Sequence, residues 1–76
     1  MFEEIKKLLV ECANVDENEV TMDANLKSLG IDSLYAVEMT LELEEHFNIS
    51  IEWEEMDNVL TIKDVVELVQ RKLGEK

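Results

Sequence analysis

One serine stands in a setting where a chemical group could be attached or an anion bound. Ser33 directly follows Asp32, and Gly30, which lets the backbone turn freely, lies just before them. From Leu34 to Phe47 the chain is rich in helix-forming Leu, Ala, Glu and Met and contains no Gly or Pro. This pattern predicts a helix that is capped by Asp32 and carries Ser33 in its first turn. Because the first N–H groups of a helix lack intrahelical partners and lie at the positive end of its dipole, a phosphate is favoured there.

Two other interpretations of Ser33 have to be weighed beside this one. Serine at a helix start is commonly only a capping or first-turn residue. A catalytic serine needs a base within hydrogen-bond reach, and the only histidine, His46, lies further along the same helix. At about 1.5 Å per residue, His46 is roughly 20 Å from Ser33. We therefore expect no catalytic residue, and we infer that Ser33 is a substrate for another enzyme rather than a catalyst.

The composition limits what the chain can be. Its 76 residues, 46% of them hydrophobic, predict a single small domain over residues 1–76, in which a substrate and a full catalytic site are difficult to enclose. The formal net charge of −12 repels nucleic acid phosphates and anionic membranes and favours basic protein partners. One cysteine and one histidine are too few for an internal disulfide or a zinc site, so no bound metal is expected.

The sequence shows no targeting or membrane segment. No signal peptide is visible, and no apolar run approaches the ~20 residues of a membrane span. We therefore expect a soluble, cytoplasmic protein that neither inserts into membranes nor binds nucleic acid.

The first part of the chain predicts one helix and a long connection. The helix ends near Ala13 or Val15, and its core-facing stripe is Phe2, Ile5, Leu8, Leu9 and Cys12. The connection from Asp16 to Asp32 is expected to include a short helical turn near Ala24 to Ser28, started by Asp23. Irregularly spaced apolar residues should anchor it to the core, namely Val20, Met22, Leu26, Leu29 and Ile31.

The second half predicts a short helix and a long one. Trp53 to Asn58 is expected to form the short helix, with Trp53 and Met56 facing inward. Ile49 to Ile51 alternates like a strand but has no partner strand. A capping box at Thr61 to Asp64 opens the last helix, which Gly74 ends. Its core stripe is Ile62, Val65, Val66, Val69 and Leu73. The predicted fold is all-α, a small bundle of three main helices plus one short helix, with a long first loop.

The helix from Ser33 to Phe47 has two different apolar faces. At 100° per residue, one face is the expected core stripe of Ala36, Met39, Thr40, Leu43 and Phe47. Leu34 and Leu41 lie nearly opposite, with Val37 between the two faces. The acids flanking the second face are Glu38, Glu42 and Glu45. We interpret this second face as a docking surface for a basic, partly apolar groove. Alternatively, its leucines are scattered surface residues or are covered by the long loop.

The acids are concentrated in one stretch. Between Lys27 and Lys63 there is no Lys or Arg, whereas nine acids occur there: Asp32, Glu38, Glu42, Glu44, Glu45, Glu52, Glu54, Glu55 and Asp57. Calcium is a less favoured explanation, because the chain has no EF-hand loop pattern. An uncompensated acidic region next to Ser33 indicates attraction of basic partners.

Several motifs resemble one protein family. They are Gly30-Ile31-Asp32-Ser33-Leu34, Val37-Glu38 and Leu43-Glu44-Glu45-His46-Phe47. In these residues, in its length and in its acidic second helix, the chain is similar to the acyl carrier proteins of fatty acid and polyketide synthesis. The similarity extends over essentially the whole chain.

The resemblance implies a cofactor and partners. It implies that Ser33, between Asp32 and Leu34, carries a 4′-phosphopantetheine arm donated by coenzyme A, and that the arm holds acyl groups as thioesters. The implied partners are a magnesium-dependent phosphopantetheinyl transferase (holo-acyl-carrier-protein synthase) and basic-surfaced acyl-processing enzymes. These would dock a monomeric carrier through Leu34, Val37, Glu38, Leu41, Glu42 and Glu45. Part of an acyl chain is implied to tuck between the helices.

Two residues depart from the family pattern. Tyr35 stands where carriers of fatty acid synthesis often have an acid, and Glu52 stands where many have proline. Two rival functions are a peptidyl or aminoacyl carrier of nonribosomal synthesis and an unmodified acidic adaptor that binds basic helices. Nonribosomal carriers tend to have a second glycine before the serine, where this chain has Ile31-Asp32.

Overall fold

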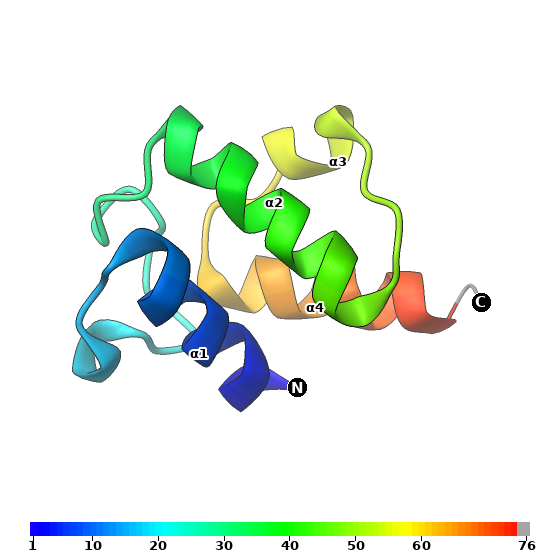
Figure 1. Ribbon diagram of the computed structural model, residues 1–76. Helices are drawn as coiled ribbons and strands as arrows, with labels where there is room; N and C mark the ends of the chain where they lie inside the picture. Colours follow the sequence, from blue (N-terminus) through cyan, green and yellow to red (C-terminus); the bar gives the residue numbers. More distant parts are fainter. Residues whose placement is uncertain (75–76) are drawn as a thin grey trace.

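The computed structural model describes residues 1–74. Its helices are α1 (Phe2–Ala13), the 3₁₀ turn η1 (Glu17–Glu19), α2 (Ser33–Phe47), α3 (Trp53–Asp57) and α4 (Ile62–Gly74). Over residues 1–74 there is no strand, only an isolated bridge between Asn25 and Thr61. In Figure 1, α1 and the short α3 lie on opposite sides of α2, with α4 extending across the bundle. The predicted all-α class and the three main helices plus a short one are confirmed.

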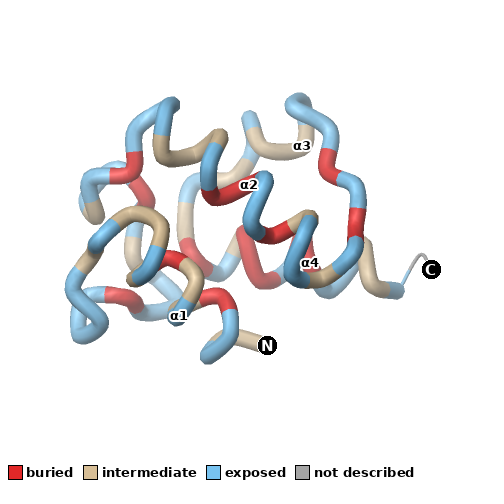
Figure 2. Tube along the Cα trace, in the orientation of Figure 1, coloured by how far each residue is buried: buried red, intermediate tan, exposed pale blue. Residues whose placement is uncertain are grey.

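The core lies where α1, α2 and α4 face one another. Figure 2 shows the buried segments of these helices gathered on their facing sides. The fully buried large side chains are Ile5, Leu9, Met39, Leu43, Ile62, Val65 and Val69. All of them fall on the predicted stripes, and α4 additionally buries Leu68. No helix within residues 1–74 is long and apolar enough to cross a membrane.

The loop between α1 and α2 is anchored as predicted at most of its apolar positions. Val20, Leu26 and Ile31 are buried, whereas Met22 is 40% exposed, so the prediction for Met22 was wrong.

No helix is assigned at residues 24–28, but a single helical turn forms one residue later than predicted, because the Leu29 N–H donates to the Asn25 carbonyl at 3.2 Å. Asn25 Oδ1, not Asp23, accepts from the Lys27 N–H at the start of this turn, at 2.9 Å. The 3₁₀ turn at Glu17–Glu19 was not predicted. Asp16 caps that turn through the Asn18 N–H, at 2.9 Å.

Backbone pairing explains why the turn at residues 25–29 does not extend into a longer helix. The Leu26 N–H donates to the Leu60 carbonyl at 2.9 Å, and the Ile62 N–H donates to the Ala24 carbonyl at 3.0 Å. The Leu26 N–H and the Ala24 carbonyl are therefore used for pairing with the chain around the start of α4, so the turn cannot begin at Ala24. Asp23 accepts the Thr21 hydroxyl at 2.9 Å rather than capping a helix.

In each of the last two helices, an acidic side chain of the first turn accepts the N–H of the residue that caps the helix. In α4 the predicted capping box is confirmed, because the Thr61 N–H donates to Asp64 Oδ2 at 3.1 Å and the Asp64 N–H donates to Thr61 Oγ1 at 3.3 Å. The N–H groups of Leu60 and then Thr61 lower the pKa of the Asp64 carboxyl. At α3, the Glu52 N–H donates to Glu55 Oε1 at 3.0 Å.

One of the two inward residues predicted for α3 points outward. Met56 is partly buried against the core, but Trp53 is 61% exposed. Ile49 and Ile51, just before α3, are buried and fill the core at this point. A helix of five residues can turn only one narrow face inward, so Trp53 at its first position is left outside.

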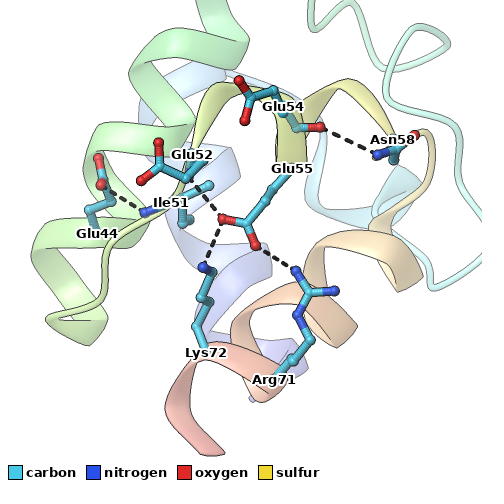
Figure 3. A network of polar contacts seen from close by, with 8 residues as sticks. All are labelled: Glu44, Ile51, Glu52, Glu54, Glu55, Asn58, Arg71 and Lys72. Atoms are coloured by element: carbon cyan, nitrogen blue, oxygen red, sulfur yellow. Dashed lines mark hydrogen bonds and ion pairs between the residues drawn. The ribbon is translucent and has the colours of Figure 1, made fainter. Parts of the chain in front are cut away.

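A carboxylate on α3 is paired with two bases on α4. Glu55 Oε2 lies 2.6 Å from Arg71 Nη2, and Glu55 Oε1 lies 2.7 Å from Lys72 Nζ. Figure 3 shows both bases reaching from α4 toward Glu55. We call these three residues the Glu55 cluster. It corrects the prediction of a fully uncompensated acidic stretch, because bases distant in sequence neutralise one of its acids.

The Glu55 cluster makes stability depend on pH in a defined direction. The Lys72 hydrogen bond, then the Glu52 N–H, lowers the pKa of Glu55 from 4.5 to about 2. A lowered carboxyl pKa stabilises the fold above the unfolded-state value and loses this effect as pH falls toward the folded-state value. We therefore expect wild type to be more stable than Glu55→Gln at neutral pH, with the difference disappearing between pH 4.5 and about 2. Urea unfolding of both proteins across this pH range measures the difference in their free energies of unfolding.

The matched control is Glu54→Gln, which removes the same charge from the same helix. Within residues 1–74 the Glu54 carboxylate has no hydrogen bond or ion pair; only its backbone carbonyl accepts, from Asn58. Its stability relative to wild type should stay nearly constant over the same pH range. A Glu55→Gln difference that persists at pH 2 would show that Glu55 does not act through its charge.

Candidate functional site

Ser33 is the first residue of α2, and its side chain is exposed. The predicted cap is confirmed: Asp32 Oδ1 accepts the Leu34 N–H at 3.0 Å and the Tyr35 N–H at 3.1 Å. Within residues 1–74 the Ser33 hydroxyl makes no hydrogen bond. Asp32 already uses two of the N–H groups that could bind an anion. The helix start therefore holds Ser33 in place and presents its hydroxyl, and it is not by itself a complete phosphate cradle.

The turn before α2 fixes the position of Ser33. Gly30 has a φ of 82°, a left-handed conformation that glycine adopts without strain. Ile31, which follows it, is buried, and its N–H donates to the Leu26 carbonyl at 3.0 Å. Ser33 thus lies between a buried anchor in the loop and the capped first turn of α2. The free turning inferred for Gly30 is confirmed by this positive φ.

A groove of about 810 Å³ opens beside Ser33. It is bounded by the end of the long loop, the first half of α2, the short α3 and the segment that follows α3. Its apolar lining residues are Leu26, Ile31, Ala36, Val37, Trp53, Met56, Val59 and Leu60. Among residues 1–74, Lys27 is the only basic residue that lines it. An exposed hydroxyl next to a largely apolar groove fits a covalently attached group that carries an apolar chain.

The second face of α2 is exposed. Leu34 is 65% exposed and Leu41 is 56% exposed, so the long loop does not cover them. The side chains of Glu38, Glu42 and Glu45 are also exposed. Val37 is half-buried and lines the groove, so it borders this face on the groove side. The α2 face, defined as Leu34, Glu38, Leu41, Glu42 and Glu45, therefore offers apolar side chains surrounded by negative charge.

The other reactive side chains lie away from Ser33. His46 is in the last turn of α2, thirteen residues after Ser33, and its Nε2 lies 3.2 Å from Glu4 Oε2 on α1. Cys12 is half-buried against the core, as its place on the α1 stripe predicted. Burial, followed by the charges of Glu42 and Glu38, raises the pKa of the Cys12 thiol. The structure thus brings no histidine base or reactive thiolate to Ser33.

Reasoning from the sequence did not predict the groove, and Lys27 and Trp53 are two of the lining residues that it did not assign to the site. Lys27 could have been noticed as the base nearest to Ser33 in the sequence. Nothing in the sequence indicated that Trp53 lines a groove, because the pattern of its short helix places the tryptophan on the inward face. Its exposure depends on how Ile49 and Ile51 fill the core.

Comparisons with known proteins identify the family. A family described as "Phosphopantetheine attachment site" matches residues 3–69. The chain is 39% identical over 75 residues to an acyl carrier protein of Petrotoga mobilis, covering 97% of this chain and 88% of that protein.

Solved structures agree with this assignment. The crystal structure of an acyl carrier protein from Thermotoga maritima matches with a TM-score of 0.86 and 27% identity, covering 96% of this chain and 86% of that one. A 3-oxo-butyl form of the acyl carrier protein of the actinorhodin polyketide synthase from Streptomyces coelicolor matches with a TM-score of 0.82 and 25% identity, covering 99% and 92%. The chain therefore belongs to the acyl carrier protein family, whose members are carriers rather than enzymes and take covalently attached 4′-phosphopantetheine as their cofactor.

Proposed function

We propose that residues 1–76 form a single carrier domain that holds acyl intermediates as thioesters on a 4′-phosphopantetheine arm attached to Ser33, in fatty acid or polyketide-type biosynthesis. The observation that carries this proposal is the position of Ser33 at a capped helix start on the edge of an apolar groove. Ser28 and Ser50 are also exposed, but both lie in loops and neither lines the groove. Among the three serines, only Ser33 combines exposure, a fixed backbone and an adjacent place for cargo.

The residues around Ser33 have separate tasks in this proposal. When attached, the arm supplies the thiol that bears the acyl group. Asp32 holds the first turn of α2 through the Leu34 and Tyr35 N–H groups, so the Ser33 oxygen is presented at a fixed place. Lys27, on the same groove, supplies positive charge near the phosphodiester and offsets the charge of Asp32. The transferase supplies the base, because the chain brings no histidine to Ser33 and the Asp32 carboxylate is bonded to the Leu34 and Tyr35 N–H groups.

The groove is the proposed shelter for the acyl chain. Its lining is predominantly aliphatic and aromatic, and Ser33 lies on its border. Moving an apolar chain from water into such a groove gains about 25 cal/mol for each Å² removed from water. An acyl group of sufficient length therefore favours the groove over solvent while the thioester waits for a partner enzyme.

The α2 face is the proposed docking surface. Its leucines offer apolar contact area, and its acids attract a basic surface, which speeds encounter and fixes orientation. It begins beside Ser33, so a partner that binds it has access to the arm. We propose that phosphopantetheinyl transferases and basic-surfaced acyl-processing enzymes share this face, together with Val37 at its edge.

Added salt should weaken binding of the transferase to this chain. Screening shortens from ~10 Å at 0.1 M to ~3 Å at 1 M salt, so long-range attraction is lost while short contacts persist. Measuring KM of the transferase for the chain against salt concentration tests this. Glu38→Gln should reduce the salt dependence, whereas Glu17→Gln, which removes an exposed charge from η1, should leave it unchanged. A KM independent of salt would remove the acidic face from the docking mechanism.

Intact-mass measurement tests the proposed function against its rivals. After incubation with coenzyme A, magnesium and a phosphopantetheinyl transferase, the chain should gain the mass of one phosphopantetheine group. An unmodified acidic adaptor would gain none. The loaded chain should then accept a malonyl group from malonyl coenzyme A in the presence of a malonyl transferase, with release of free coenzyme A. Acceptance of an aminoacyl group in its place would favour the nonribosomal alternative.

A further inference from the structure

Trp53 is a large apolar side chain in an unusual position. It is the only tryptophan of the chain, it is 61% exposed, and it lines the groove that begins at Ser33. Met56, Val59 and Leu60 line the same side of the groove, with Asp57 as the one charged residue that α3 adds. An exposed indole among aliphatic groups has much apolar area left to bury.

The short α3 is held from its other side. Trp53 and Glu55 are two residues apart, which is about 200° around a helix, so they point in nearly opposite directions. Glu55 bonds Arg71 and Lys72 on α4, and Glu55 Oε1 also accepts the Glu52 N–H at the start of α3. Figure 3 shows Glu55 at the centre of these contacts, between α3 and α4.

The other attachments of α3 are modest. Met56 is only partly buried, and no residue from Trp53 to Asp57 is fully buried. A five-residue helix is also too short to be stable on its own. The Glu55 cluster is therefore a principal constraint on where α3, and with it Trp53, lies relative to the groove.

We propose that Trp53 contacts the acyl cargo, covering chains that are long enough to reach it, and that the Glu55 cluster is a positioning device that keeps Trp53 at the groove. This rests on the proposed function, in which the acyl arm is attached to Ser33. The occupant is the acyl chain rather than the arm itself. The wall formed by Trp53, Met56, Val59 and Leu60 is apolar, whereas the arm is polar and amide-rich. Because only longer acyl chains reach Trp53, retention of an acyl chain in the groove depends on the length of that chain.

The fluorescence of Trp53 tests this, because no other tryptophan contributes. The samples are the unmodified chain, the chain loaded with the free-thiol arm, and chains loaded with acetyl and octanoyl arms. We expect the unmodified, free-thiol and acetyl samples to have the same emission wavelength and the same acrylamide quenching. In the octanoyl form the emission should shift to shorter wavelength, and acrylamide quenching should fall about threefold as the ring becomes covered. An octanoyl form that behaves like the acetyl form would overturn the proposal, as would a full shift with the free-thiol arm.

Intact mass of each sample separates this proposal from the proposed function. Absence of loading contradicts attachment of the arm, whereas complete loading without a change in Trp53 contradicts only the cargo contact. The positioning role is tested by Glu55→Gln, with Glu54→Gln as the control on the same helix. Octanoyl Glu55→Gln should be quenched about threefold more strongly than octanoyl wild type, and Glu54→Gln should match wild type.

Circular dichroism shows whether a change in Trp53 quenching in a variant results from loss of its fold. Circular dichroism of Glu55→Gln should retain the helix content of wild type, because α1, α2 and α4 form the core without Glu55. Arg71→Gln provides a second variant that removes one partner while leaving the Glu55 cap of α3 in place. If acrylamide quenches Trp53 in the octanoyl forms of both variants no more strongly than in octanoyl wild type, the Glu55 cluster does not position Trp53.

Discussion

Ser33→Ala should abolish loading with phosphopantetheine and leave the fold intact. The loss of loading is expected to be complete, because the substitution removes the oxygen to which the arm is proposed to be attached. The fold should survive because Asp32, not Ser33, caps α2. An exposed side chain that makes no hydrogen bond within residues 1–74 can be truncated at a cost within about 0.5 kcal/mol. Intact mass after the transferase reaction and thermal unfolding measure the two effects.

The other two serines provide matched controls for this prediction. Ser28→Ala and Ser50→Ala each remove one exposed hydroxyl, and both variants should load like wild type. Ser28 is the stricter control because it lies only five residues before Ser33, in the loop that leads into α2. Residual loading of Ser33→Ala would contradict the attachment site, and unfolding of this variant would contradict the assignment of the cap to Asp32.

Truncation of two leucines on α2 should have opposite effects. Leu43 is 1% exposed, so Leu43→Ala should create a core cavity and lower the free energy of unfolding by about 2–5 kcal/mol. Leu41 is 56% exposed on the same helix, so Leu41→Ala should change stability by no more than about 0.5 kcal/mol. If the α2 face is the docking surface, Leu41→Ala should instead raise KM of the transferase.

The pair is informative because the substitution is the same and only the face of the helix differs. Urea unfolding and transferase kinetics of both variants, compared at a temperature where both are folded, separate stability from docking. If Leu41→Ala destabilises as much as Leu43→Ala, the helix is buried on both sides. If Leu41→Ala alters neither stability nor KM, the docking surface lies elsewhere.

Local signals in the sequence predicted most of the fold. Apolar residues at helical spacing placed α1, α2 and α4, and Asp32, Thr61 and Asp64 were recognised as caps because capping depends on side chains close in sequence. The exposure of Leu34 and Leu41 followed from the helical wheel, because a small bundle cannot surround a helix. Ser33 could also be singled out from the sequence, because Gly30, Asp32 and the helical pattern that begins at Leu34 are its immediate neighbours in the chain.

The features that were missed depend on contacts between distant segments. The pairing of Leu26 with Leu60 moved the expected helical turn one residue along the chain, to Asn25 and Leu29. Glu55 meets Arg71 sixteen residues away, which no pattern in its own helix indicates. The exposure of Trp53 depends on neighbouring side chains that fill the core. The groove beside Ser33 combines the loop, α2 and α3, so its existence follows only from their assembly.

Attachment of the arm to Ser33 is tested most directly by mapping the modification on the loaded wild-type chain. The chain is incubated with coenzyme A, magnesium and a phosphopantetheinyl transferase, digested, and analysed by fragmentation mass spectrometry. We predict one phosphopantetheine group per chain, located on Ser33 within the sequence Gly30-Ile31-Asp32-Ser33-Leu34. Modification of Ser28 or Ser50, or an unmodified chain after a transferase has loaded a known carrier under the same conditions, would contradict it.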